Sequence, residues 1–327
     1  MTTYKDIRGT HIKTVTTDPP APVNGQMWYN STDQAMKGFK ILNVGAWTSA
    51  NAMNTGRRQL AGGGSQTAGI AFGGENSGSA NLANTEQYNG TSWTEVADLN
   101  TARYLLGGSG ETNTSAIAVG GEVDPGGNQA LAETWNGSSW TEVGDLNTAG
   151  RQVAVAAANS SNALCFGGGR PSYSALTESW NGSAWTEVGD LNDARSDMAA
   201  SGTYNACLGF GGDTPPVTGN TESWNGSAWT EVSDLNTARS QLGASSTSQT
   251  AALAFGGYTS TAVGVTEDWN GASWSEVADL NTANNGIAGG GTTTAALAFG
   301  GAQPSSPTGL TEEWSGTTPS TVTFTAS

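Results

Sequence analysis

Residues 206–232 read ACLGFGGDTPPVTGNTESWNGSAWTEV. An apolar run ends in a Gly-Gly pair, and after a polar stretch come a Glu, a Trp, an Asn-Gly pair and a second Trp. Asn-Gly between two short β-prone runs is a strong signal for a two-residue hairpin, because both turn positions need positive φ. The stretch therefore predicts an apolar strand followed by a hairpin.

The same pattern recurs along most of the chain. Its Gly-Gly pair returns at intervals of 44–47 residues, beginning at Gly73, Gly120, Gly167, Gly211, Gly256 and Gly300. The segment before each apolar run is long enough for one more strand, so each repeat supplies four. Four strands per repeat and six repeats predict an all-β, six-bladed β-propeller, because radial packing buries what one small sheet cannot. A solenoid is the main rival, but neither end of the chain resembles a polar cap.

The two ends carry partial copies of the repeat. Trp47 lies 46 residues before Trp93, so we expect the segment around Trp47 to complete the last blade and close the ring. A strand at 321–325 is the alternative closing element. Residues 1–40 are rich in Thr and Pro and predict an extended arm followed by a small hairpin. The expected domains are an anchoring arm at 1–40 and the propeller at 41–327.

Two resemblances follow from these motifs. An apolar run ending in Gly-Gly, then a spaced aromatic and a Trp at this period, resembles the kelch repeat over roughly residues 41–327. That resemblance implies a propeller of the galactose-oxidase type, a scaffold that mostly binds proteins or sugars. Residues 19–32, PPAPVNGQMWYNST, are similar to short segments of bacteriophage tail and fibre proteins. This second resemblance implies attachment to a virus particle.

Composition narrows the classes of partner. Lys and Arg number 12 against 28 Asp and Glu, a formal net charge of −16, which disfavours nucleic acid and anionic membranes. The chain shows neither a signal peptide nor an apolar run long enough to span a membrane. Cys165 and Cys207 lie in apolar runs, where we expect buried, unpaired thiols.

The sequence offers no catalytic constellation. His11 is the only histidine, which excludes the copper site of galactose oxidase and a Ser-His-Asp triad. Arg103, Arg151, Arg195 and Arg239 are interpreted as one repeated, structural position. The repeated carboxylates are interpreted as hydrogen-bond acceptors that hold the fold: Glu86, Glu133, Glu178, Glu222, Glu267, Glu312, Asp98, Asp145, Asp190, Asp234 and Asp279. We therefore expect no enzyme, cofactor or metal, with glycan cleavage by loop carboxylates as a remote alternative.

The repeats differ most between the Gly-Gly pair and the Glu. These stretches are 75–84, 122–131, 169–176, 213–220, 258–265 and 302–310, and in a propeller they gather on one face. Variable loops on a rigid scaffold are a common place for recognition. The predicted ligand-binding side chains there are Glu122, Arg170, Tyr173, Asp213 and Tyr258.

Together these expectations describe a non-enzymatic, virion-associated adhesion or decoration protein. Its arm would dock onto other virion proteins, in multiple copies, and its loop face would bind a host surface glycan or protein. It would be made in the host cytoplasm without a signal peptide. The alternative is a purely structural virion subunit whose propeller packs against capsid or tail proteins.

Overall fold

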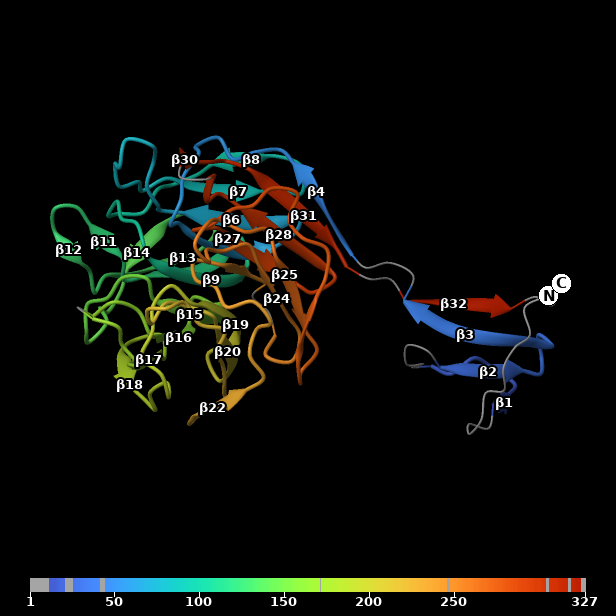
Figure 1. Ribbon diagram of the computed structural model, residues 1–327. Coiled ribbons are helices and arrows are strands. Elements are labelled where there is room, and N and C mark those ends of the chain that lie inside the picture. Colours follow the sequence, from blue (N-terminus) through green and yellow to red (C-terminus); the bar gives the residue numbers. More distant parts are fainter. Residues whose placement is uncertain are drawn as a thin grey trace. The chain divides into compact units, whose positions relative to one another are not determined.

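The computed structural model describes residues 12–20, 26–41, 45–170, 172–245, 248–303, 306–316 and 319–324. It divides into two compact units, which are unit 1 (Met1–Gly45 and Gly316–Ser327) and unit 2 (Ala46–Ser315). Every regular element in the described residues is a strand, and none is a helix that could cross a membrane (Figure 1). Relative to the expected division after residue 40, the first boundary lies later and the last residues belong to unit 1.

The described part of unit 2 contains six four-stranded antiparallel sheets, which makes the fold propeller-like. Sheet 1 contains β5 (Ala61–Ser65), β6 (Ala68–Phe72), β7 (Thr85–Tyr88) and β8 (Trp93–Glu95), and sheet 2 contains β9 (Gly107–Thr112), β10 (Ser115–Val119), β13 (Ala132–Trp135) and β14 (Trp140–Glu142). Sheet 3 contains β15 (Ala154–Asn159), β16 (Asn162–Phe166), β17 (Thr177–Trp180) and β18 (Trp185–Glu187), and sheet 4 contains β19 (Ala199–Thr203), β20 (Ala206–Phe210), β21 (Thr221–Trp224) and β22 (Trp229–Val232). Sheet 5 contains β23 (Gly243–Ala244), β24 (Ala252–Phe255), β25 (Thr266–Trp269) and β26 (Trp274–Glu276), and sheet 6 contains β27 (Ala288–Gly291), β28 (Ala295–Phe299), β31 (Thr311–Ser315) and β4 (Ala46–Ala50). Short hairpins, β11 (Glu122–Val123) with β12 (Gly127–Asn128) and β29 (Ala302–Gln303) with β30 (Ser306–Pro307), lie in two of the loops.

Sheet 6 takes its outer strand from the beginning of the chain. β4 pairs antiparallel with β31, and Trp47 stands opposite Trp314. The predicted pairing of the Trp47 segment with the last repeat is confirmed. The C-terminal strand β32 (Pro319–Phe324) instead pairs with β3 (Ala35–Ile41) in unit 1.

The first strands of neighbouring sheets contact one another in sequence, and β27 contacts β5. Just before each first strand, one residue has a φ between +53° and +58° and donates its backbone N–H to the equivalent carbonyl of a neighbouring repeat at 2.7–3.2 Å. We call these residues the mouth ring: Gln59, Leu105, Gln152, Asp197, Gln241 and Gly286. Their six hydrogen bonds run from one repeat to the next and return to the first.

The core lies between adjacent sheets. The second strand of each sheet is almost fully buried, as its continuous apolar character predicts. In five of the six sheets a Phe at the end of that strand packs on a Trp of the next sheet, as in Phe210 and Trp274, whose ring centroids are 4.9 Å apart. Cys165 and Cys207 are buried and unpaired, which confirms their predicted role.

Unit 1 contains a small sheet with the order β1 (Lys13–Val15), β2 (Met27–Asn30), β3 and β32. β2 and β3 form the predicted hairpin. Asp18 accepts hydrogen bonds from Asn30, Lys37 and Trp28, and these contacts lower its pKa to about 2. The expected extended arm is therefore, in its described residues, largely a sheet completed by the other end of the chain.

Candidate functional site

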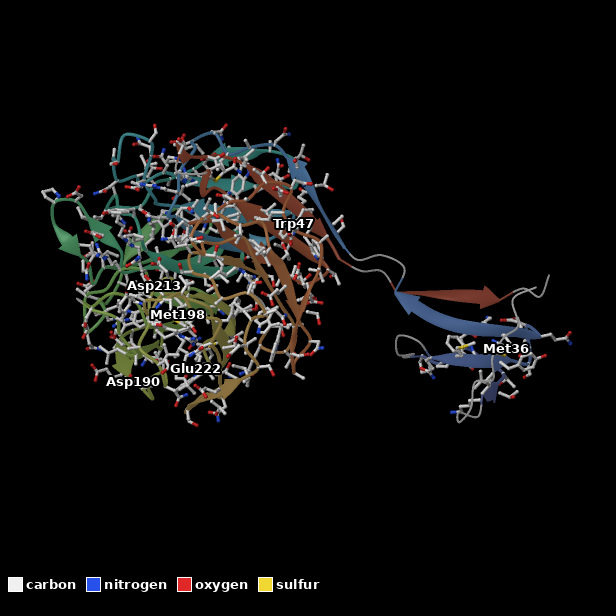
Figure 2. The ribbon with its side chains drawn as sticks, in the orientation of Figure 1. Met36, Trp47, Asp190, Met198, Asp213 and Glu222 are labelled. Carbon is white, nitrogen blue, oxygen red and sulfur yellow. The ribbon has the colours of Figure 1, made fainter. Side chains whose placement is uncertain are left out.

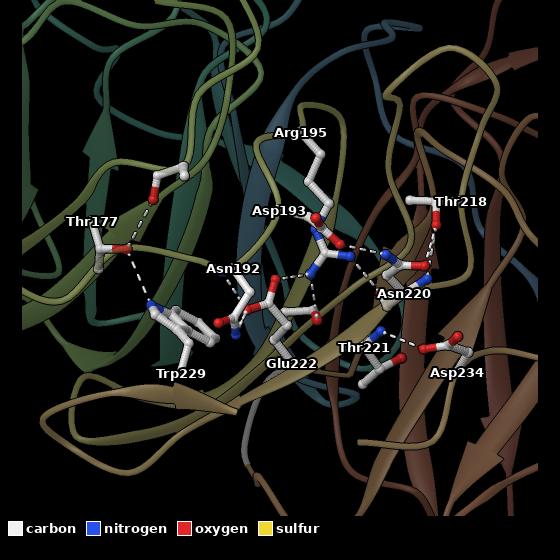
Figure 3. Close-up of polar contacts among 12 residues, drawn as sticks. Thr177, Asn192, Asp193, Arg195, Thr218, Asn220, Thr221, Glu222, Trp229 and Asp234 are labelled. Atoms are coloured by element: carbon white, nitrogen blue, oxygen red, sulfur yellow. Dashed lines mark hydrogen bonds and ion pairs between the residues drawn. The ribbon is translucent and has the colours of Figure 1, made fainter. Parts of the chain in front are cut away.

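The repeated Glu residues join neighbouring sheets. In Figure 3, Glu222 of sheet 4 accepts the backbone N–H of Asn192 at 2.8 Å, the side-chain amide of Asn192 at 2.7 Å, and Arg195 Nη2 at 3.1 Å. Asn192 and Arg195 lie on the connection that leaves sheet 3. The equivalent Asn and Glu pairs are Asn54–Glu86, Asn100–Glu133, Asn147–Glu178, Asn236–Glu267 and Asn281–Glu312. The predicted role of these Glu residues as acceptors that hold the fold is confirmed.

Other repeated side chains make a second set of links. Trp229 Nε1 donates to Thr177 Oγ1 of the preceding sheet at 3.1 Å, and four more junctions carry the same bond. Asp234 accepts the backbone N–H of Thr221. Asp98, Asp190 and Asp279 do the same for their own repeats. The six repeated Glu residues, four of the repeated Asp residues and five of these tryptophans thus form hydrogen bonds within the scaffold; Asp145 and Trp185 show no such bond within the described residues.

The prediction about the repeated arginines was right for three residues and wrong for Arg151. Arg103, Arg195 and Arg239 are buried and paired with Glu133, Glu222 and Glu267. Burial is the largest cause lowering the pKa of these three guanidinium groups. Arg151 stands one residue later in its repeat, is partly exposed and pairs with Glu122.

Gly150 occupies the arginine position in the third repeat, and Arg170 fills the space. Arg170 Nη1 lies 2.8 Å from Glu178 Oε1, and its Nε donates to the Gly167 carbonyl at 3.1 Å. A Cβ built on Gly150 would lie 2.9 Å from Arg170 Cγ. Arg170 was predicted to bind a ligand, but its side chain is fully buried beneath the loops. Anchoring the repeats on Asn-Thr-Ala, at 147–149 and 100–102, would have aligned Gly150 with Arg103.

The remaining predicted site residues lie on the loops. Tyr173 and Tyr258 are 40% and 39% exposed. The Tyr173 hydroxyl donates to Asp213 Oδ2 at 3.2 Å. Burial, followed by Asp213, raises the pKa of Tyr173. Glu122, by contrast, forms an ion pair with Arg151, whose Nη1 donates to Glu122 Oε2.

Three of these residues occupy the same place in their repeats. Each forms a β-bridge with the residue just before a mouth-ring residue, namely Glu122 with Tyr104, Asp213 with Ser196 and Tyr258 with Ser240. The structure therefore arranges them around the mouth ring. Figure 2 labels Asp213 and Met198, which follows the mouth-ring residue Asp197.

A cavity of about 90 Å³ opens at the mouth ring, and the sequence analysis missed it. All six mouth-ring residues line it and are half-buried. The next residue of each repeat lines it from below and is buried, giving an apolar ring of Leu60, Leu106, Val153, Met198, Leu242 and Ile287. A second cavity of about 120 Å³ is lined by this ring and by small residues of the first strands, such as Gly62, Gly108 and Ala154.

Asp197 is the acidic residue of the mouth ring. It accepts a hydrogen bond from Gln152 Nε2. Burial is the largest cause raising its pKa to about 7, Asp213 raises it further, and Arg151 lowers it. Among the residues around the mouth, Glu75 and Glu122 are paired with Arg58 and Arg151. Within the described part of the chain, Asp197 and Asp213 form no salt bridge, so this sector of the mouth is negative.

Comparison with known proteins adds no relative. No family model matches the chain, and no curated protein matches it. The resemblances to kelch repeats and to phage proteins therefore rest on the residues quoted for them. In the described residues, no group of three or more His, Cys, Asp or Glu is placed to hold a metal ion.

Proposed function

We propose that unit 2 is a closed, six-bladed propeller of the kelch type and a non-enzymatic binding module. Six four-stranded sheets and a cycle of backbone hydrogen bonds that returns to its start support the blade number and the closure. The Gly-Gly, Glu and Trp of each repeat support the kelch assignment. Such a ring is a rigid platform for loops.

The ligand is proposed to be a host surface glycan or protein that binds the loop face around the mouth ring. One observation carries this proposal. The repeated Glu residues form hydrogen bonds that join neighbouring sheets, whereas Tyr173 and Tyr258 are exposed on loops that differ between repeats. Exposed aromatic rings offer flat apolar contact with a polar hydroxyl, which suits sugars and protein surfaces alike. Asp213, bonded to Tyr173, adds an acceptor to the same surface.

Unit 1 is proposed to attach the protein to a larger assembly, a virus particle, in multiple copies. The similarity of residues 19–32 to phage tail and fibre segments supports this. Residues 21–25 of that stretch lie outside the described residues. The small sheet of unit 1 pairs β32 with β3, so segments that precede and follow unit 2 in the sequence lie in one sheet.

Binding of purified protein to host cells and to a glycan array tests the loop-face proposal. We expect the double variant Tyr173→Ala, Tyr258→Ala to lose binding. Tyr204→Ala is the matched control, because Tyr204 is 38% exposed but lies on the turn between β19 and β20, at the opposite end of those strands. Equal loss in the control, or release of a product from a glycan, would overturn the proposal.

Electron cryo-microscopy of the particle tests the attachment. We expect unit 1 to be bound to particle proteins and the loop face to be open to solvent. A loop face buried against neighbouring subunits would make the protein architectural, and a particle lacking the protein would refute the virion assignment.

A further inference from the structure

We propose that the mouth ring binds the ammonium group of a small unbranched alkylamine, whose alkyl chain lies against the apolar ring beneath it. The inference concerns the cavity at the mouth ring and does not rely on the loop tyrosines. It can therefore fail or hold separately from the proposed function.

The hydrogen-bonding groups of the mouth ring favour one sign of charge on the ligand. All six backbone N–H groups of the mouth ring donate hydrogen bonds to carbonyl oxygens of the ring itself. An anion would need such donors, and here they point along the ring to neighbouring carbonyls. Each carbonyl oxygen accepts one N–H and keeps a second lone pair. The backbone of the mouth thus offers acceptors and no free donor.

The side chains extend this acceptor surface. Gln59, Gln152 and Gln241 contribute carboxamides, whose oxygens accept while their NH2 groups donate, and Asp197 contributes a carboxylate, which only accepts when ionised. The carboxamides of Gln59 and Gln241 have no side-chain hydrogen bond within the described residues. An ammonium group has three donors and no acceptor, which matches such a surface. Hydrogen bonds between an ammonium and a carboxylate are among the strongest in proteins.

Charge favours the same ligand. Arg58 and Arg151, the arginines at the edge of the mouth, are each paired with a Glu. Asp197 and Asp213 have no such partner in the part of the chain that is described. Burying an uncompensated carboxylate is unfavourable, and a bound cation would relieve this cost.

Size and polarity select among cations. The cavity of about 90 Å³ has a polar rim and an apolar floor formed by residues such as Leu60 and Met198. A narrow site of this kind accepts one head group on a slender stem. An amino sugar carries its ammonium on a bulky ring. We therefore assign the site to an alkylammonium.

The probe is n-butylammonium, titrated into the whole chain and followed by calorimetry. We expect saturable binding at one site per chain. Asp197→Asn should weaken it about tenfold or more, the effect of losing one hydrogen bond to a charged group. Glu187→Gln, which removes an exposed carboxylate from the outer strand β18, is the matched control and should change nothing.

Two more measurements keep the proposal falsifiable if Asp197→Asn folds poorly. Gln241→Leu should weaken binding severalfold without a change in charge, and Leu105 shows that this ring position accommodates leucine at the same φ. Binding to the unaltered protein should be tighter at pH 8 than at pH 6, because Asp197 ionises between them; Asp213, Glu122 and Arg151 are the other charged groups around it.

Three outcomes would overturn the assignment. The first is the absence of saturable binding. The second is equal binding of n-butanol, which would indicate an apolar channel alone. The third is binding of glucosamine as tight as that of n-butylammonium, which would contradict the size argument.

Discussion

The substitution Arg170→Ala should lower the stability of the protein by more than the position of Arg170 on a variable loop suggests. Arg170 Nη1 is 2.8 Å from Glu178 Oε1, and both side chains are almost fully inaccessible to solvent. Removing one partner of a buried ion pair leaves the other charge uncompensated, at a cost of about 3–5 kcal/mol. For a unit of this size, each kcal/mol shifts Tm by about 2–4 °C, so we expect a fall of roughly 10 °C.

The other repeats suggest a rescue. Gly150 does not have positive φ, and four of its five equivalents are arginines, as at Arg103 and Arg195. Gly150→Arg alone should destabilise the protein, because Arg170 Cγ and Nε already lie within 3.0 Å of a Cβ at this position. Gly150→Arg combined with Arg170→Ala should regain most of the lost stability, because the new arginine can reach Glu178 as its equivalents do.

Thermal and urea unfolding of the four proteins form a double-mutant cycle that measures this coupling. Arg151→Ala is the control, since its partly exposed pair with Glu122 should contribute less than about 1 kcal/mol. The reasoning fails if Arg170→Ala costs no more than Arg151→Ala, or if the double variant is no more stable than Arg170→Ala.

Three further predictions concern stability. Within the described residues, Trp185 Nε1 is buried without a hydrogen-bond partner, because Ala132 stands where other repeats have Thr. Ala132→Thr should therefore raise the free energy of unfolding by about 1 kcal/mol, and no gain in urea unfolding would contradict this. The pKa of Asp197 is about 7 in the folded protein and near 3.9 in the unfolded chain. The free energy of unfolding should therefore fall by about 2–4 kcal/mol as pH rises from 4 to 7, and this dependence on pH should be absent in Asp197→Asn. Trp47→Ala should cost about 3–5 kcal/mol, since Trp47 packs on Phe255 and bonds to Thr266; an unchanged Tm would show that β4 is dispensable.

Much of the fold could be predicted from the sequence because its signals are local. Asn-Gly turns fix the hairpins, and Trp47, at one repeat length before Trp93, predicts the strand that completes sheet 6. The sequence does not decide where the C-terminal strand pairs, since Pro319 stands where the repeat has a Trp. Its pairing with β3 depends on a partner at the other end of the chain.

The candidate site was harder to predict because its residues share a backbone conformation and no residue type. Gln152, Asp197 and Gly286 occupy the same ring position with nearly the same φ, so comparison of side chains does not single the position out. Arg170 shows the opposite difficulty. Its loop is variable in sequence, yet its side chain performs the structural task of a repeated arginine elsewhere.

The pairing of β4 with β31 also constrains how the protein is made on the ribosome. About 260 residues separate the two strands, so β4 is synthesised long before its partner. At roughly 5–20 residues per second, β4 waits about 10–50 s with an unpaired edge. Until Ser315 emerges, sheets 1 and 5 lack the completed sheet 6 as a neighbour. The edge of β4 is therefore open to pairing with another strand until translation of this region is complete.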